Sequence, residues 1–162
     1  MTCALAEYAR RVTEDQFWTV IGAIDNPAAM NEDRESEIAD GIAGRLRPHG
    51  VEALSAFEEH LAEKLYRIDT RAHCDAGGDA SNSSDGFLYA RCFVVACGRE
   101  VYEAVATDPR QMPTRSDQWL EPLLFVGANV HAELTGNDIE DWQPETRFDY
   151  ETGSNRDGWP EQ

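Results

Sequence analysis

The pattern of apolar and polar residues predicts an all-helical chain. The longest segment with few charges runs from Ser83 to Val105, and apolar residues recur there at steps of three and four. At about 100° per residue, such steps place side chains on one stripe of a helix. Neighbouring apolar residues widen the stripe to more than half of the circumference, which is typical of a helix covered by several others. We therefore predict a central helix that starts near Ser84, with an apolar stripe of Phe87, Ala90, Val94, Cys97, Val101 and Ala104.

Two residues interrupt this stripe. Gly98 costs about 1 kcal/mol relative to alanine in a helix interior, so the helix is expected to bend or restart there, or another backbone to approach closely. Arg91 lies inside the apolar arc, where an unpaired charge is rare. Its side chain either extends to water at the edge of the stripe, or is buried and held by a carboxylate such as Asp69, or stays open for an anionic ligand.

Further amphipathic segments predict the remaining helices. Thr13 and Gln16 form the pattern of a capping box, in which each side chain bonds the backbone of the other at a helix start. In the third predicted helix, acidic residues and one lysine interrupt the apolar period and are assigned to the solvent-facing side: Glu58, Glu59, Glu63 and Lys64. The predicted helices cover residues 1–12 (short or frayed), about 14–24, 34–47, 51–68 and about 116–135, in addition to the central one.

Residues 73–84 are polar and are predicted to form a loop before the central helix. Asp75, Asp79, Asn82 and Asp85 could surround a calcium ion, but position twelve from Asp75 is Gly86, where an EF-hand has glutamate. The four cysteines fit no zinc template. We therefore expect a polar loop and no metal site.

The ends of the chain differ from its middle. From residue 137 to 162 there are eight acidic residues against Arg147 and Arg156, with four aromatic residues between them. These aromatic residues either attach the segment to the bundle or belong to a partner-binding tail. We predict one all-α domain over residues 1–136 (core 14–136), with five or six helices around the central one. An irregular acidic tail, residues 137–162, would follow it.

One pattern of residues covers the central segment: Ser83, Asp85, Gly86, Phe87, Arg91, Phe93 to Val95, Gly98, Arg99, Val101, Tyr102, Asp108 and Pro109. With this pattern the chain resembles an uncharacterised bacterial family known as domain of unknown function 4240. The resemblance runs over residues 14–136 and is specific at 83–109. Ser84, Ala90 and the pair Thr70-Arg71 depart from the family pattern. The resemblance implies a mainly helical fold and no established activity.

The net charge of −17 is the strongest feature of the composition. It opposes binding to nucleic acids and to anionic membranes, which need a cationic surface. It permits a basic protein partner and also serves solubility. With no signal-peptide pattern and no apolar run near the length of a membrane span, we expect a cytoplasmic protein with reduced cysteines.

The common catalytic and nucleotide-binding motifs are absent from the sequence. We therefore expect no cofactor and favour a non-enzymatic role, namely a regulatory or immunity-type binding module for a basic partner. The alternative is an enzyme or a binder of small anions that uses Asp85, Arg91 and Arg99, with an aspartate as acid or base and arginine as the anion clamp. The candidate site residues are Asp69, Asp85, Arg91 and Arg99.

Overall fold

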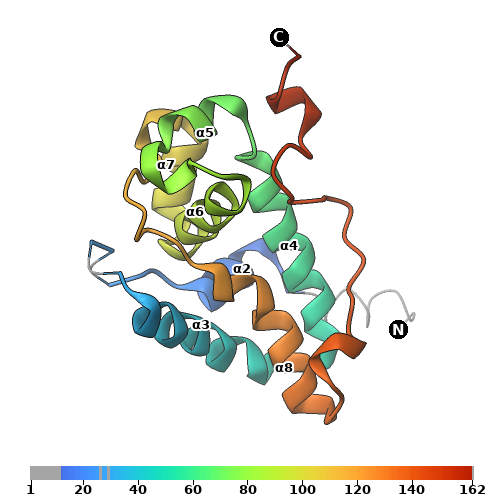
Figure 1. Cartoon of the computed structure of the whole chain (residues 1–162). Helices are drawn as coiled ribbons and strands as arrows, with labels where there is room; N and C mark the ends of the chain where they lie inside the picture. The colour runs from blue at the N-terminus through green and yellow to red at the C-terminus, as the bar shows by residue number, and fades with distance from the viewer. Residues whose placement is uncertain (1–11, 26, 29, 162) are drawn as a thin grey trace.

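The described part of the chain is built from α-helices and short 3₁₀-helices (η), which confirms the predicted all-α class (Figure 1). The computed structural model describes residues 12–25, 27–28 and 30–161. Seven α-helices occur in these residues, and no strand does. Their bounds are α2 Glu14–Ile21, α3 Glu32–Leu46, α4 Leu54–Arg67, α5 Arg71–Ala76, α6 Ser84–Ala96, α7 Arg99–Thr107 and α8 Val126–Thr135. The 3₁₀-helices are η1 Arg47–His49, η2 Val51–Ala53, η3 Gly78–Ser81, η4 Pro109–Gln111, η5 Glu121–Phe125, η6 Ile139–Asp141 and η7 Arg156–Gly158.

Side-chain caps start several of these helices. Thr13 and Gln16 form the predicted capping box, with bonds of 2.8 and 3.2 Å between each side chain and the other residue's backbone. The Ser83 hydroxyl accepts a bond from the Gly86 amide at 3.0 Å, which fixes the first turn of α6. Such caps satisfy backbone donors that have no partner within the helix. The helix proposed within residues 1–12 lies almost wholly outside the described residues.

The long apolar stripe belongs to two helices, because the first helix ends before Gly98 and a second begins after it. Gly98 has φ +98°, a conformation that side chains disfavour. A Cβ built there would lie 2.9 Å from the Gly22 carbonyl oxygen, so the backbone after α2 approaches the break closely. Both the restart and the close approach were predicted from the sequence. The break separates α6 from α7.

The structure has more helices than the five or six expected, partly because the predicted loop at 73–84 is largely helical. The Thr70 hydroxyl accepts a bond from the His73 amide at 3.1 Å and so starts α5. His73 then bonds the Val105 carbonyl oxygen through Nε2 at 2.9 Å, which ties α5 to α7. The second contact joins segments that are 32 positions apart in the sequence, and periodicity within one segment cannot reveal it.

Helix α6 provides much of the buried core. Most of its residues are buried, and it contacts α4, α7, η3 and η5. Figure 1 shows α6 beside α5 and α7 in one half of the molecule, with α3 and α8 in the other. In the described part of the chain, no helix is long and apolar enough to cross a membrane.

The segment after Gly136, which we call the tail, is irregular apart from η6 and η7. Gly136 is left-handed, with φ +74°, and ends α8 as predicted. From η6 the tail runs back along α4 toward the half of the molecule that holds α5 and α6 (Figure 1). This course brings the tail over two of the candidate site residues.

Candidate functional site

Arg91 is fully buried and binds the tail. Its guanidinium donates to the Leu65 carbonyl oxygen of α4 at 2.9 Å, to the Tyr150 carbonyl oxygen at 3.0 Å and to the Thr152 hydroxyl at 3.2 Å. The guanidinium carbon also lies 4.7 Å from the centroid of the Phe87 ring. Of the alternatives left by the sequence, the structure therefore shows a buried arginine, held by backbone carbonyls and a hydroxyl.

Asp69 is fully buried as well and binds the next part of the tail. Its carboxylate accepts bonds from the Gly153 amide at 3.1 Å and from the Asn155 amide at 3.0 Å. The Trp159 indole N–H donates to it at 2.8 Å. A buried carboxylate with this many donors is well compensated for the loss of water.

Asp69 and Arg91 act on the same segment without touching each other. No hydrogen bond or ion pair joins their side chains among the described residues. Burial lowers the pKa of Arg91 from its ordinary value, and the negative charge of Asp69 opposes that shift. Each of the two charged groups is bonded to its own set of tail atoms.

The tail brings an aromatic anchor to the same place. The Trp159 ring packs edge-on against Phe87, with 6.1 Å between centroids, and the Arg71 guanidinium lies 5.0 Å from the Trp159 ring. The Asn155 side-chain amide donates to the Tyr66 carbonyl oxygen at 3.0 Å. We call the surface made by Tyr66, Asp69, Arg71, Phe87 and Arg91 the tail cleft.

The other two predicted site residues lie outside the tail cleft. Asp85 is exposed in the first turn of α6. Arg99 begins α7 and pairs with Asp15 of α2 at 2.8 Å, with half of its side chain in water. The structure thus brings Asp69 and Arg91 together, while Asp85 and Arg99 stand apart from this pair.

Glu58 is a buried ionisable residue that the sequence placed on the solvent side of α4. Only 5% of it is exposed, and its Oε1 has no hydrogen-bond partner among the described residues. Burial raises its pKa to about 8. The assignment was wrong because α8 and the tail cover this face. A Cβ at Gly127 would lie 2.1 Å from Glu58 Oε1 and 3.0 Å from the Trp142 ring.

Lys64 is the second residue of that face which the structure buries. Only 5% of it is exposed, and its ammonium group pairs with Glu14 of α2 at 2.9 Å. The partner lies 50 positions away in the sequence. Glu63 and Glu59 keep more contact with water than Lys64 does, with 42% and 24% of their side chains exposed.

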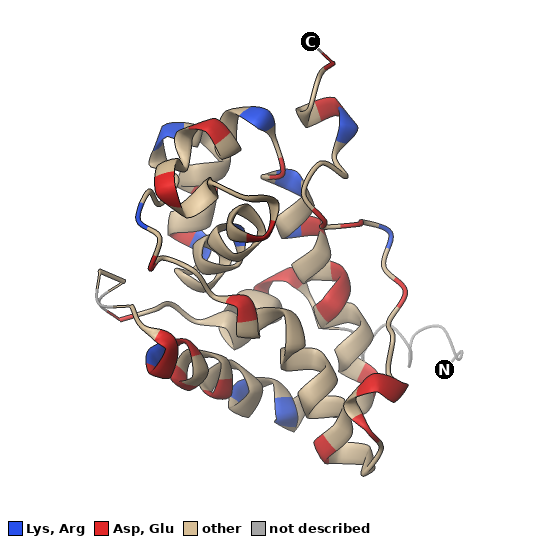
Figure 2. Ribbon diagram, in the orientation of Figure 1, with Lys and Arg blue, Asp and Glu red and all other residues tan. Residues whose placement is uncertain are grey.

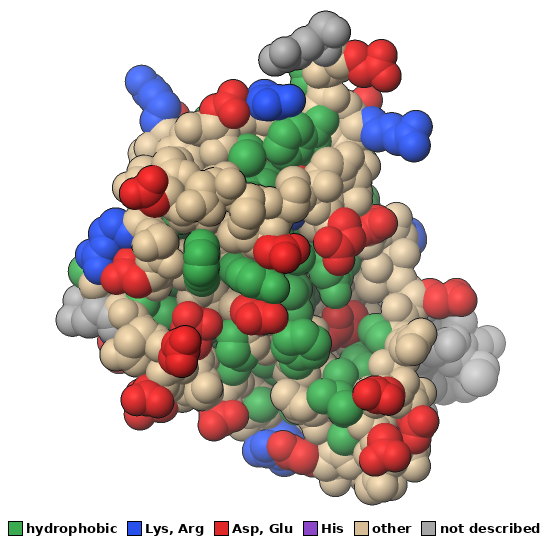
Figure 3. All heavy atoms as spheres, viewed as in Figure 1, with side chains coloured by type: hydrophobic (Ala, Val, Ile, Leu, Met, Phe, Trp, Pro, Cys, Tyr) green, Lys and Arg blue, Asp and Glu red, His purple; other side chains and the backbone are tan. Residues whose placement is uncertain are grey.

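A second candidate site is an open groove between α3, η5 and α8, with a volume of about 1000 Å³. Its apolar lining includes Phe125 and Ile139, of which 48% and 39% are exposed. Its acidic lining residues are Asp40, Glu121 and Glu133. Figure 3 shows hydrophobic side chains on this face with acidic side chains gathered around them. We call this feature the acidic groove.

Few cationic side chains lie near the acidic groove, and the one in its lining forms an ion pair. Arg47, which lines the groove, pairs with Glu133 at 2.7 Å. In Figure 2, α3 carries several acidic residues along its length with a smaller number of basic ones. Burial and then the charges of Glu121 and Glu32 raise the pKa of Glu35.

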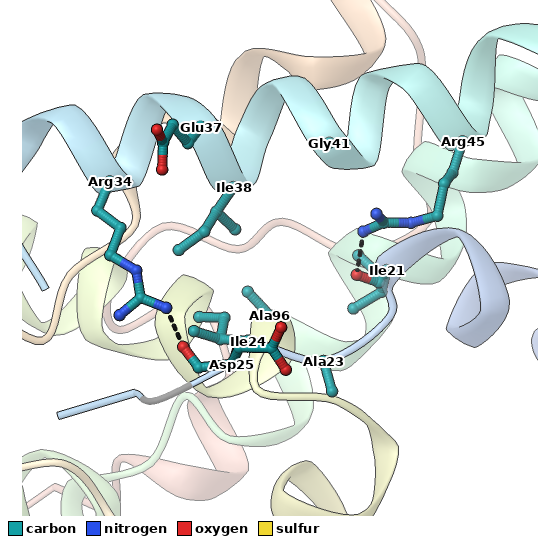
Figure 4. Close-up of a pocket in the computed structure, with 10 residues that line it drawn as sticks. All are labelled: Ile21, Ala23, Ile24, Asp25, Arg34, Glu37, Ile38, Gly41, Arg45 and Ala96. Carbon is teal, nitrogen blue, oxygen red and sulfur yellow. Dashed lines mark hydrogen bonds between the residues drawn. The ribbon is translucent and has the colours of Figure 1, made fainter. Parts of the chain in front are cut away.

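A smaller hollow of about 240 Å³ lies between α3 and the chain that follows α2 (Figure 4). Arg45 donates to the Ile21 carbonyl oxygen at 2.8 Å, and Arg34 donates to the Asp25 carbonyl oxygen. Ile24 and Ile38 line the space between these two arginines. Ligand pockets generally have about 300–1,000 Å³, so this hollow is small for a substrate.

The described cysteines and acids do not form reactive or metal-binding clusters. Burial raises the pKa of Cys92 and of Cys97 to about 12, which keeps both thiols protonated. Within the described ranges, no group of three or more histidine, cysteine, aspartate or glutamate residues could hold a metal ion. A protonated, buried thiol is a poor nucleophile.

Comparison with known proteins places the chain in a family. No curated protein and no solved structure matches it significantly. A family model matches residues 12–133, which include all four predicted site residues, whereas the last two residues of α8 and the tail lie beyond the match. The chain therefore belongs to the family described as protein of unknown function (DUF4240).

Proposed function

We propose that this protein is a binding module that engages a basic protein partner through the acidic groove. The observation that supports it most is the combination of exposed Phe125 and Ile139 with carboxylates at Asp40, Glu121 and Glu133 around one open groove. Exposed apolar residues with a polar border are typical of protein interaction sites. The net charge of −17 adds long-range attraction for a cationic partner.

The chemistry of the groove favours an amphipathic basic helix as the occupant. Such a helix would place apolar residues against Phe125 and Val126 and its lysine or arginine residues against the carboxylates. An amphipathic helix that lays its apolar face in a hydrophobic groove is a recurring mode of recognition. The lining from α3 and α8 provides the two walls that this mode needs.

The alternative, an enzyme or small-anion binder built on Asp85, Arg91 and Arg99, has less support. Arg91 is buried and uses its donors on the backbone and on Thr152. Arg99 is neutralised by Asp15. An anion clamp needs cationic donors that converge on open space. The geometry therefore favours the binding module.

We place this activity in the cytosol. Cys74, Cys92 and Cys97 are free thiols in the structure. Unpaired cysteines fit a reducing compartment, because disulfides form mainly in oxidising ones.

The test is affinity capture from the native cell extract at low and high salt, with the wild type and a charge-reversed groove variant. The variant Asp40→Lys/Glu121→Lys removes part of the acidic border. The control variant Glu100→Lys changes an exposed acid on α7. We expect one basic protein to be retained by the wild type and by Glu100→Lys at low salt, and to be lost at high salt or with the groove variant. Equal retention by both variants would contradict the proposal.

A further inference from the structure

We propose that the tail cleft is a peptide-binding surface that the chain's own tail covers, and that a short, turn-forming, tryptophan-bearing segment of a partner protein can replace the tail there. This inference concerns a different surface from the acidic groove and stands independently of the proposed function. It rests on how the tail is held, on what the tail leaves unsatisfied, and on how the tail is attached.

The cleft holds the tail largely by its backbone. Asp69 accepts from the amides of Gly153 and Asn155, and Arg91 donates to the carbonyl oxygen of Tyr150. Backbone-directed bonds of this kind provide affinity without requiring a particular sequence. The segment that they hold is folded into turns, with η7 at Arg156–Gly158 between Asn155 and Trp159. Both charged groups are provided by the helical body, at the end of α4 and within α6.

Specificity comes from two side-chain positions of the tail. The Thr152 hydroxyl accepts from Arg91 at 3.2 Å and donates to the Ser84 carbonyl oxygen at 2.7 Å. Trp159 combines an indole bond to Asp69 with ring contacts to Phe87 and Arg71. Trp159 is half-buried, and a tryptophan with a cation over its ring is a common anchor at protein interfaces.

The residue before the anchor has to be small. A Cβ on Gly158 would lie 2.8 Å from the Asp69 carbonyl oxygen and 2.8 Å from Thr70 Cγ2. Contacts that close do not occur for real side chains, so any larger residue would push the segment away from the cleft. The ligand is therefore a segment that can adopt the turns of residues 150–159, with a hydroxyl-bearing residue and, further along, a glycine followed by tryptophan.

The tail leaves one donor of the cleft unused. The Nε–H of Arg91 is buried and has no acceptor among the described residues. A buried donor without an acceptor is unfavourable, because it has lost its hydrogen bonds to water. A partner segment that provides one more acceptor, such as a carboxylate or a carbonyl oxygen, would bind this cleft more strongly than the tail does.

The attachment of the tail allows it to leave as a unit. Beyond η6 its one helical segment among the described residues is the three-residue η7. Its contacts to the body are hydrogen bonds to backbone and side-chain groups, the ion pair between Arg147 and Glu59, and ring contacts. The family match ends at residue 133, so the cleft belongs to the matched domain and the tail does not. A tethered ligand of this kind competes at an effective concentration on the order of millimolar. A partner segment has to overcome that competition.

The experiment uses the full chain and a fluorescent peptide with the sequence of residues 147–161. The variant Trp159→Ala weakens the tethered tail, and the matched control Trp142→Ala removes a tail tryptophan that stacks on His131 outside the cleft. We expect the peptide to bind Trp159→Ala at least tenfold more tightly than the wild type or Trp142→Ala. Adding Asp69→Asn to Trp159→Ala should remove this binding, as should replacing the peptide's own tryptophan with alanine.

Two results of the peptide-binding experiment would overturn the proposal. One is that the peptide fails to bind a Trp159→Ala variant whose circular dichroism matches the wild type; the other is equal binding after Asp69→Asn. Amide hydrogen exchange on the wild type is a second test that needs no variant. We expect the Gly153 and Asn155 amides to exchange faster than those within α6, because the tail opens without global unfolding. Exchange of these amides only by global unfolding would show that the tail is a fixed part of the fold.

A second copy of the chain is the competing occupant. If tails were exchanged between copies, the wild type would form a concentration-dependent dimer, which size-exclusion chromatography with light scattering detects. We expect a monomer, because two chains of charge −17 repel each other. A dimer that Asp69→Asn dissociates would assign the cleft to a second tail and overturn the assignment to a partner segment.

Discussion

The acidic groove and the tail cleft use charge in opposite ways. In the groove, Asp40, Glu121 and Glu133 stand in water around exposed apolar residues. In the cleft, Asp69 and Arg91 are fully buried and nearly all of their bonding capacity is used by the chain itself. Exposed carboxylates contribute little to the free energy of unfolding, but they attract cations over a distance. A buried charge needs hydrogen-bonding partners, because removing them strongly destabilises the folded state. The comparison indicates that the groove is open to solvent, whereas the cleft is closed by the tail.

The largest expected effect separates two aspartates that the sequence treated alike. Asp69→Ala leaves the Gly153 and Asn155 amides and the Trp159 indole without their acceptor. We expect a loss of about 3–5 kcal/mol in the free energy of unfolding, as for breaking one partner of a buried charged network. Asp85→Ala, at an exposed position, should change it by less than about 0.5 kcal/mol. Urea denaturation measures both, and equal losses would contradict the distinction between buried and exposed positions.

A second effect concerns Glu58, which lies under the tail. Its Oε1 has no hydrogen-bond partner among the described residues. Its pKa in the folded protein is about 8, above the ordinary value of 4.5 for an unfolded chain. Between these values the folded state binds more protons than the unfolded state, so this residue lowers stability as the pH rises from about 4.5 to 8. The slope is on the order of 1 kcal/mol per pH unit.

Glu58→Gln should remove this dependence. The amide is nearly the same size as the protonated carboxyl group and cannot ionise. Tyr150, whose pKa is raised to about 12 by burial first and then by charges that include Glu58, stays neutral throughout this range. Denaturation of both proteins at several pH values gives the difference between the two curves. That difference should widen from pH 5 to 8, and two parallel curves would contradict the burial of an unpaired Glu58.

A third effect tests how closely the tail approaches the body. Gly158→Ala places a methyl group against the Asp69 carbonyl oxygen, so we expect a loss of about 1–3 kcal/mol, as for overpacking. Gly136→Ala adds a methyl group that meets nothing within 4 Å but adopts φ +74°. It should cost about 1–2 kcal/mol from backbone strain alone. The two variants differ in tail release, which tryptophan fluorescence reports: only Gly158→Ala should change it through Trp159.

The smallest effect on stability is expected at the groove. Phe125 is 48% exposed, so Phe125→Ser should lower the free energy of unfolding by about 1 kcal/mol or less. The same variant should weaken binding of the basic partner by at least tenfold, because a central aromatic residue often dominates an interface. Thermal denaturation and titration of the partner separate the two effects. A large stability loss with unchanged binding would show that Phe125 belongs to the fold and not to a recognition site.

Periodicity predicted most of the helices. It missed α5, and it began the last helix near residue 116, whereas α8 begins at Val126 after η5. It predicted the contacts between helices poorly. The capping box at Thr13, the break at Gly98 and the end at Gly136 follow from local chemistry, which a short window of sequence contains. The third predicted helix was correct in period, yet Glu58 was assigned to water. Its neighbours Gly127 and Trp142 lie about seventy to eighty positions away, and no local pattern specifies them.

The candidate site was predictable to a similar extent. A charged residue within an apolar arc marked Arg91, and Asp69 was named as its possible neighbour; both meet at the tail cleft. The sequence could not show which residues these two side chains bind. Arg91 bonds Tyr150 and Thr152, and Asp69 bonds Gly153, Asn155 and Trp159. Nearly every residue has a backbone amide and a carbonyl group, so the sequence does not mark which ones form these bonds. The aromatic residues of the tail were the one available signal, and they had two open interpretations.

Amide hydrogen exchange of the full chain, with and without the captured basic partner, tests the central claim most directly. The account predicts new protection in α3 and α8 around the acidic groove, and unchanged exchange at the tail amides of Gly153 and Asn155. New protection confined to the tail cleft, or to the opposite face of the molecule, would contradict the assignment of the acidic groove as the binding surface.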